Sequence, residues 1–198
     1  METIDALQEI QTGSHEAVKV FSGGFTNAMT GLSQMAGQEI KISRMEFKKV
    51  PVKEVSALFG GPEALIIAVY LEISGKTNGQ MVVVYEPQVA YDLIDLLLSQ
   101  SQGTTRELSE MERSTLGEVG NIMGSFFLNY VSDTTGIRFQ PSPPAVMMDM
   151  AGAILDASLA GLMEFSDDIY IMETVFGTND RQVAGTFLVI PDPGLEGK

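Results

Sequence analysis

The chain has 198 residues, 44% of them hydrophobic, enough for a buried core in one sizeable domain or two small ones. Its net charge of −14 argues against nucleic-acid binding, because it repels phosphate backbones. The lack of cysteine and a single histidine exclude thiolate and multi-histidine metal sites within one chain. No apolar run approaches the roughly 18 residues that cross a bilayer, and the first residues are acidic. We therefore expect a soluble cytoplasmic protein.

The acidity has two interpretations. It can serve solubility alone, or it can match a basic or metal-bearing partner. Net charge does not choose between them.

The first half of the chain carries a series of element signals separated by glycine and proline. They predict a long helix that ends at Gly37, a strand at 40–42, a short helix at 52–59, and a hairpin of 64–73 with 80–85. A helix at 87–98 then leads to the clearest linker of the chain, at 99–105.

The second half predicts the same order of elements. They are a long helix that ends at Gly136, a strand at 137–139, a helical segment at 147–162, and a hairpin of 169–176 with 183–190. Glycine and Asn or Asp in both hairpin turns supply the positive φ angles that turns need.

This repetition predicts a duplication, with copies at about 1–98 and 107–194. Gly37 maps to Gly136, a shift of 99 residues. We expect one α/β (α+β) domain with a pseudo-twofold axis, in which both copies share an antiparallel sheet and two long helices cover one face.

The second long helix has three distinct strips when residues are placed about 100° apart. A capping box at Ser109 and Glu112 marks its start. The predicted core strip contains Val119, Ile122, Met123, Phe126 and Tyr130, the polar strip Ser114, Glu118, Asn121 and Ser125, and the small strip Gly117, Gly120 and Gly124. The glycines indicate either tight packing within the domain or room for a docking partner.

The polar strip can be an ordinary solvated face or a functional site. Glu118 and Asn121 lie one turn apart, so both can be presented to a second molecule. An amide can orient a water molecule and a carboxylate can pair with a lysine. Neither is a strong nucleophile, so hydrolysis here would work by positioning, with the metal supplied elsewhere.

The spacing Ser114-x3-Glu118-x2-Asn121-x22-Pro144 resembles the signature of the CheC, CheX and FliY phosphatases. The resemblance implies a CheC-like fold and removal of phosphate from the chemotaxis response regulator CheY. It makes Glu118 the residue that pairs with a CheY lysine, and Asn121 the residue that orients the attacking water. Ser114 and Pro144 take supporting roles. The resemblance also implies that Mg²⁺ comes with CheY, and we expect no cofactor or metal to be bound by this chain.

Some members of that family have a site in each copy. Subtracting 99 from the motif positions gives His15, Lys19, Ser22 and Met45. None keeps the required residue type, so we expect the first site to be inactive. His15 and Lys19 remain open to a different contact, although His15 is expected to be a surface residue.

The family resemblance also implies binding to CheD, the receptor deamidase. The candidate surface is the segment 145–165, with Asp149 and Asp156 as its exposed acids. Its methionines, Met147, Met148, Met150 and Met163, can adapt to a partner or fill the core.

These observations leave three hypotheses about function. The first is a CheY-phosphate phosphatase with one intact site. The second is a weakly catalytic or non-catalytic binding module that acts on CheD or at the flagellar switch. The third is a duplicated structural domain with a chance motif.

Overall fold

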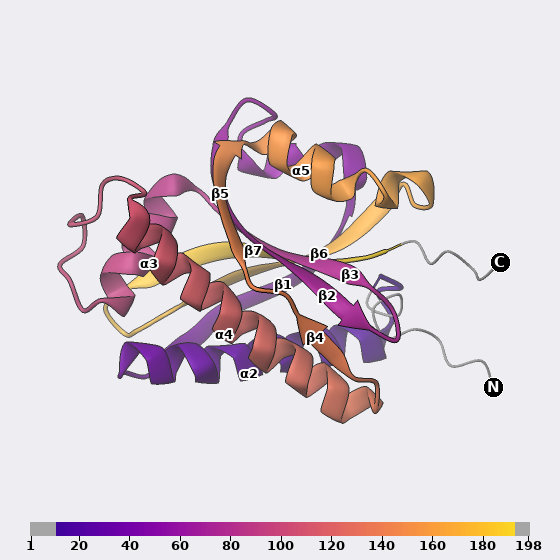
Figure 1. Ribbon diagram of the computed structural model, residues 1–198, viewed down its shortest axis with the longest axis horizontal. Helices are drawn as coiled ribbons and strands as arrows, with labels where there is room; N and C mark the ends of the chain where they lie inside the picture. The colour runs from indigo at the N-terminus through magenta and orange to yellow at the C-terminus, as the bar shows by residue number, and fades with distance from the viewer. Residues whose placement is uncertain (1–10, 193–198) are drawn as a thin grey trace.

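The computed structural model describes residues 11–192, which form one antiparallel sheet with helices on both faces (Figure 1). The helices are α2 (His15–Ala36), α3 (Pro87–Leu97), α4 (Glu110–Thr135) and α5 (Ala151–Leu159), with the 3-10 helices η1 (Val52–Phe59) and η2 (Leu162–Glu164). The strands are β1 (Lys41–Pro51), β2 (Leu65–Gly75), β3 (Gly79–Tyr85), β4 (Phe139–Pro141), β5 (Ala145–Met150), β6 (Asp168–Gly177) and β7 (Gln182–Pro191). This mixed architecture confirms the predicted fold class.

The strand order is β1-β6-β7-β3-β2-β4, and β5 also pairs with β2. Each predicted hairpin forms, β2 with β3 and β6 with β7, and the two hairpins meet where β3 pairs with β7. The outer strand beside each hairpin comes from the other half of the chain. This symmetric order is what a duplication would give, and the division into two repeats stays a prediction.

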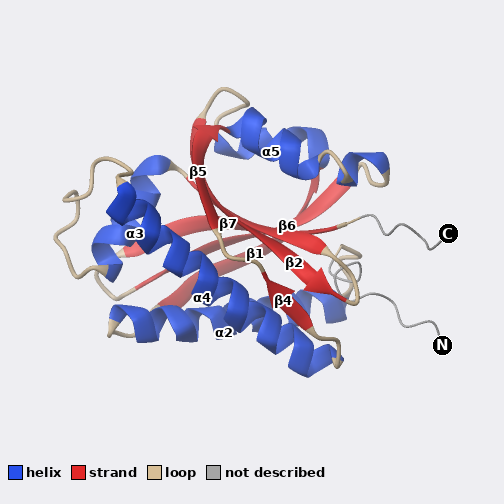
Figure 2. Cartoon of the chain, viewed as in Figure 1, coloured by secondary structure: helices blue, strands red, loops and turns tan. Residues whose placement is uncertain are grey.

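An apolar cluster lies on each face of the sheet. Figure 2 shows the helices that cover these faces, with α2 and α4 on one side and α5 on the other. Under α2, α3 and α4 the larger cluster includes Phe21, Phe25, Phe127 and Phe187. Under η1 and α5 the smaller cluster includes Ile66, Val82 and Leu188. Alternation along β2 sends Ile67, Val69 and Leu71 toward the long helices and Ile66 and Ala68 toward α5. The two long helices therefore share one face, as expected.

The long helices pack against each other through reciprocal contacts. Gly23 of α2 faces Tyr130 of α4, and Gly31 faces Ile122 and Phe126. Between these contacts the Asn27 amide donates to the Phe126 carbonyl at 2.7 Å, across a separation of 99 residues. A shift of 99 residues converts the Gly23–Tyr130 contact into the Gly31–Ile122 contact, because Gly23 maps to Ile122 and Tyr130 maps to Gly31. The packing of the two helices therefore fits the predicted shift.

Three sequence expectations about element bounds need correction. Residues 147–150 are strand, not helix, because β5 pairs with β2 from Tyr70↔Ala145 to Leu65↔Met150. The strand predicted at 40–42 runs to Pro51 because β6 pairs with its whole length. The strand predicted at 137–139 lies at Phe139–Pro141, beside the end of β2. In each case the pairing partner sets the bounds.

The expected strips of α4 are also refined. Val119 and Met123 are buried, but Ile122, Phe126 and Tyr130 are half-buried against α2. Leu116 and Phe127, outside the predicted strip, complete the face toward the sheet. At the start of α4 the Ser109 hydroxyl contacts the Glu112 carboxylate instead of capping a backbone N–H, so the predicted capping box does not form.

Within residues 11–192, no helix is long and apolar enough to cross a membrane.

Candidate functional site on helix α4

Three of the motif side chains lie together on the exposed face of α4. Ser114, Glu118 and Asn121 are exposed, and Pro144 approaches them from the loop that enters β5. They line an open groove of about 460 Å³ between the helix and this loop. Its lining residues are Glu110, Arg113, Ser114, Gly117, Glu118, Asn121, Pro144 and Val146. The structure thus brings all four motif positions to one depression.

The opposite face of α4 fixes the direction of these side chains. Leu116, Val119 and Met123 are fully buried against the sheet. A helix held on that side must present the residues about half a turn away to solvent. The sheet-facing residues therefore orient Glu118 and Asn121 outward.

The three glycines of α4 have different environments. A Cβ at Gly120 would collide with Val69 and lie 3.1 Å from Pro144 Cβ, and one at Gly124 would lie 2.9 Å from Leu71. These two positions allow close packing of the helix on the sheet. At Gly117 a Cβ would have no neighbour within 4 Å, and Gly117 lines the groove. Tight packing therefore accounts for Gly120 and Gly124, and a docking partner at Gly117 stays a prediction.

The loop that carries Pro144 is fixed to β2. Ser142 N donates to the Glu72 carbonyl at 2.8 Å, and Glu72 N donates to the Ser142 hydroxyl at 2.9 Å. Beyond Pro144, the loop continues directly into β5. Pro144 thus sits on a short, anchored connection beside the helix.

Glu118 and Asn121 have unused hydrogen-bonding groups. Among the described residues, neither side chain makes a hydrogen bond or an ion pair. Their carboxylate and amide are therefore available to a second molecule. Ser125, which the helical wheel also placed on the polar strip, is half-buried and does not line the groove.

In the part of the chain that the structure describes, no three histidine or acidic side chains gather closely enough to hold a metal ion.

The first-copy positions are arranged differently. His15 and Lys19 are exposed on α2, whereas the half-buried Ser22 donates its hydroxyl to the Val18 carbonyl at 2.6 Å. Met45 lies on β1 and packs against the larger core cluster. These residues do not reproduce the free carboxylate and amide of α4.

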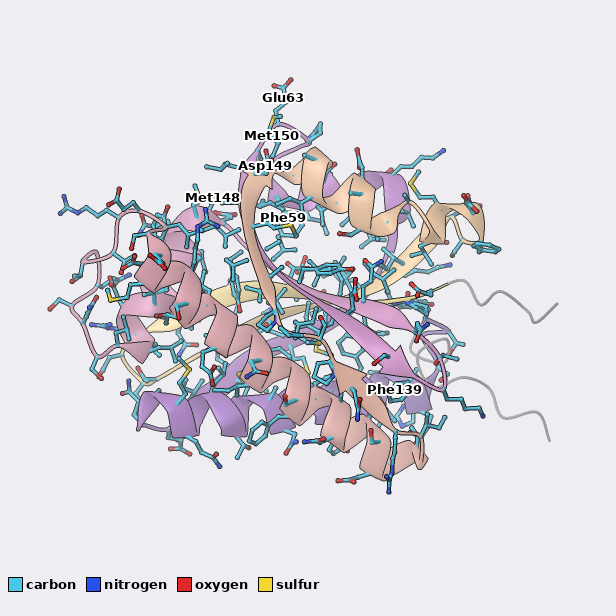
Figure 3. All side chains as sticks on the ribbon, viewed as in Figure 1. Phe59, Glu63, Phe139, Met148, Asp149 and Met150 are labelled. Atoms are coloured by element: carbon cyan, nitrogen blue, oxygen red, sulfur yellow. The ribbon has the colours of Figure 1, made fainter. Side chains whose placement is uncertain are left out.

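A second depression lies around β5 and α5, and we call it the β5–α5 groove. Its lining residues include Tyr70, Gln80, Arg113, Met147, Asp149, Ile154 and Ser158. Figure 3 shows Met148, Asp149 and Met150 in succession along β5, near Glu63. Asp149 and Asp156 are exposed.

The methionines of this segment divide into two pairs. Met150 and Met163 are exposed, whereas Met147 and Met148 pack against the two core clusters. Core filling therefore accounts for half of them.

Sequence reasoning missed Glu110, Arg113 and Val146 as groove residues. Arg113 donates from Nη1 to the Val146 carbonyl at 3.1 Å, which ties α4 to β5. A helical wheel places Glu110 and Arg113 beside Gly117 and could have found them. Val146 has no such signal, because its position depends on the pairing of β5.

Comparisons with known proteins show which family this chain resembles. A sequence model of the CheC-like family matches residues 111–148, a span that contains all four motif positions. The CheY-P phosphatase CheC of Bacillus subtilis is 24% identical over 173 residues, covering 85% of this chain and 83% of that protein.

Two solved structures share the fold. FliY of Thermotoga maritima has a TM-score of 0.72 at 22% identity, covering 87% of this chain and 86% of that one. The CheX–CheY–BeF3–Mg²⁺ complex of Borrelia burgdorferi gives a TM-score of 0.54 at 15% identity, covering 88% and 97%. The family match over the site-bearing segment and the CheC relative along most of the chain show that this protein is similar to the CheC-like family.

Proposed function

We propose that this protein is a phosphatase that removes the phosphoryl group from the chemotaxis response regulator CheY. One observation carries the proposal: Glu118 and Asn121 are exposed one turn apart in a single groove, and neither is engaged within the described structure. The CheC relative, named a CheY-P phosphatase, supports the choice of substrate. Action on a response regulator also implies a cytoplasmic location.

The proposed chemistry is positional, because this site contains no strong nucleophile. Asn121 enters the CheY active site, where its amide holds the attacking water in line with the phosphorus. Glu118 pairs with a CheY lysine and anchors the complex. CheY supplies the Mg²⁺ that neutralises charge on the transferred group. The related CheX complex contains CheY, BeF3 and Mg²⁺, which supports a partner-borne metal.

Ser114 and Pro144 support these two residues in the proposal. Ser114 lies one turn before Glu118 on the exposed strip, and Pro144 forms the opposite wall of the groove. Neither acts on the reacting atoms. They shape the surface that the receiver domain meets.

The test is the decay of phosphorylated CheY with this protein at substoichiometric amounts and Mg²⁺ held constant. A catalyst shortens the half-life of all the phosphorylated CheY, so each protein molecule turns over many times. A stoichiometric burst, or decay at the rate of CheY alone, would contradict the proposal.

A second candidate function is a CheD-binding module. The exposed acid Asp149 lines the β5–α5 groove, Asp156 is an exposed acid of α5, and the exposed Met150 adds an adaptable apolar contact. Capture of CheD by the wild type and by Asp133→Ala, together with loss of capture in Asp156→Ala, would support it. Asp133 is an exposed acid on α4 and provides the matched control. The two functions can coexist.

A further inference from the structure

Arg113 connects the candidate site to the edge of the sheet. Its exposed side chain extends from α4, one turn before Gly117, and donates from Nη1 to the carbonyl of Val146 at 3.1 Å. Val146 is the second residue of β5, a strand that pairs with β2 alone. The opposite edge of β5 has no strand partner in the described structure, and Arg113 binds that strand from the helix side.

The same stretch of chain contains the proline wall of the groove. Ser142 is bonded to Glu72 of β2, and Pro144 packs against Gly120, whose missing side chain leaves the space that Pro144 fills. Pro144 therefore lies between two attachments. Ser142 fixes it to the sheet on one side, and the Arg113–Val146 bond fixes it to α4 on the other.

The groove is lined by one basic and two acidic side chains in addition to its polar residues. Arg113 is the basic residue among the lining residues, and Glu110 and Glu118 are acidic. Within the described residues, Arg113 forms no ion pair with either acid. The guanidinium donates to a backbone carbonyl and pairs with neither acid, so the Glu118 carboxylate is open to a partner.

We propose that Arg113 is a positioning residue of this site, which holds the Pro144–Val146 wall against α4 so that the groove fits the receiver domain. The inference rests on the proposed phosphatase function. Arg113 acts through Pro144 and Val146 and does not touch the reacting atoms. Its loss should therefore weaken docking more than it slows the chemical step.

The first experiment is a double-mutant cycle with Arg113→Met and Pro144→Ala, read as KM and kcat for phosphorylated CheY. Arg113→Met keeps the aliphatic stem and removes the donors. We expect KM to rise about five-fold, as for one lost hydrogen bond, with kcat changed less than about two-fold. If Arg113 acts through the wall, the double variant has a KM close to that of the worse single variant.

Two further variants define the role of the side chain. Arg113→Lys keeps a charged donor group on a long stem and should recover most of the wild-type KM. Arg106→Met removes another exposed arginine, which lies in the loop before α4, and should leave KM unchanged. Additive effects in the cycle would instead mean that Arg113 contacts CheY directly, and would overturn the inference.

The second experiment is hydrogen exchange of the β5 amides, which needs no phosphatase activity. Without Arg113, the edge strand should open more often, so its amides exchange faster in Arg113→Met than in wild type or Arg106→Met. Unchanged exchange would overturn the inference even if the phosphatase is active. If the wild type fails to dephosphorylate CheY, the proposed function fails, and exchange alone decides whether Arg113 holds the wall.

Discussion

The two long helices lie on the same face of the sheet (Figure 1), but they present different side chains to solvent. On α4, Glu118 and Asn121 are free and border an open groove. The positions 99 residues earlier on α2 are Lys19 and Ser22. Lys19 reverses the charge, and the Ser22 hydroxyl is bonded to its own helix.

The sides that face the sheet differ as much as the exposed ones. Gly120 of α4 leaves room for Val69 and Pro144, whereas the equivalent position of α2 is the buried Phe21. Phe21 packs edge-on against Phe47, Phe127 and Phe187, with ring centroids 5.3 to 5.7 Å apart. The helix that carries the candidate site thus has a glycine against the sheet where the other long helix has a buried aromatic ring.

The largest effect should come from removing the buried aromatic ring of Phe21 on α2. Phe21→Ala removes a fully buried ring and should lower the free energy of unfolding by about 3–5 kcal/mol. Denaturant unfolding measures this loss. Because Phe21 does not line the groove, phosphatase activity of the remaining folded protein should be largely retained. A loss below about 1 kcal/mol would contradict its role as a core residue.

Asn121→Ala tests the polar side. We expect the rate of CheY dephosphorylation at saturation to fall about 100-fold, comparable to the loss of one preorganised hydrogen-bonding group. Asn129→Ala, which changes another exposed asparagine of α4, is the matched control. Equal activity in the two variants would remove Asn121 from the site.

Gly117→Ala separates the two interpretations of the glycine strip. Because the new methyl group meets nothing within the domain, better helix propensity should raise the free energy of unfolding by about 1 kcal/mol. If the receiver domain packs against Gly117, KM should rise in this more stable protein. Gly120→Ala is the contrasting variant and should destabilise, because its Cβ collides with Val69.

The smallest effect should come from transplanting the polar pair. Lys19→Glu with Ser22→Asn restores the two residue types on α2 but leaves Phe21 and Met45 in place. We expect the phosphatase rate, measured in an Asn121→Ala background, to change less than about two-fold. Substantial recovery of activity would show that the polar residues alone distinguish the two faces.

Much of the framework follows from local sequence signals. Gly37 and Gly136 end the long helices in the left-handed conformation, with φ of 64° and 72°. The hairpins form where alternation and turn residues predicted them. The positive φ angles predicted for both turns occur only in the second, at Gly177, and none occurs at 75–79. The helix predicted at 147–150 is wrong because the hydrophobic residues there show neither a clear helical nor a clear strand periodicity. Pairing with β2 sets the conformation of this segment.

The site was only partly predictable, because part of it depends on how distant segments pair in the sheet. The spacing of Ser114, Glu118 and Asn121 specifies a shared helix face, and their exposure follows from the buried residues opposite. The Arg113–Val146 bond joins two elements whose relative position depends on the whole sheet. A helical wheel also cannot distinguish Phe126, which faces another helix, from Val119, which faces the sheet.

The most direct test of the central claim measures binding and catalysis together in Glu118→Gln and Asn121→Ala. CheY activated with BeF3 and Mg²⁺ provides the binding partner, and phosphorylated CheY provides the substrate. We predict that Glu118→Gln weakens binding about ten-fold, whereas Asn121→Ala binds nearly as wild type but no longer accelerates phosphate loss. If both variants bind and dephosphorylate CheY as the wild type does, the α4 groove is not the site.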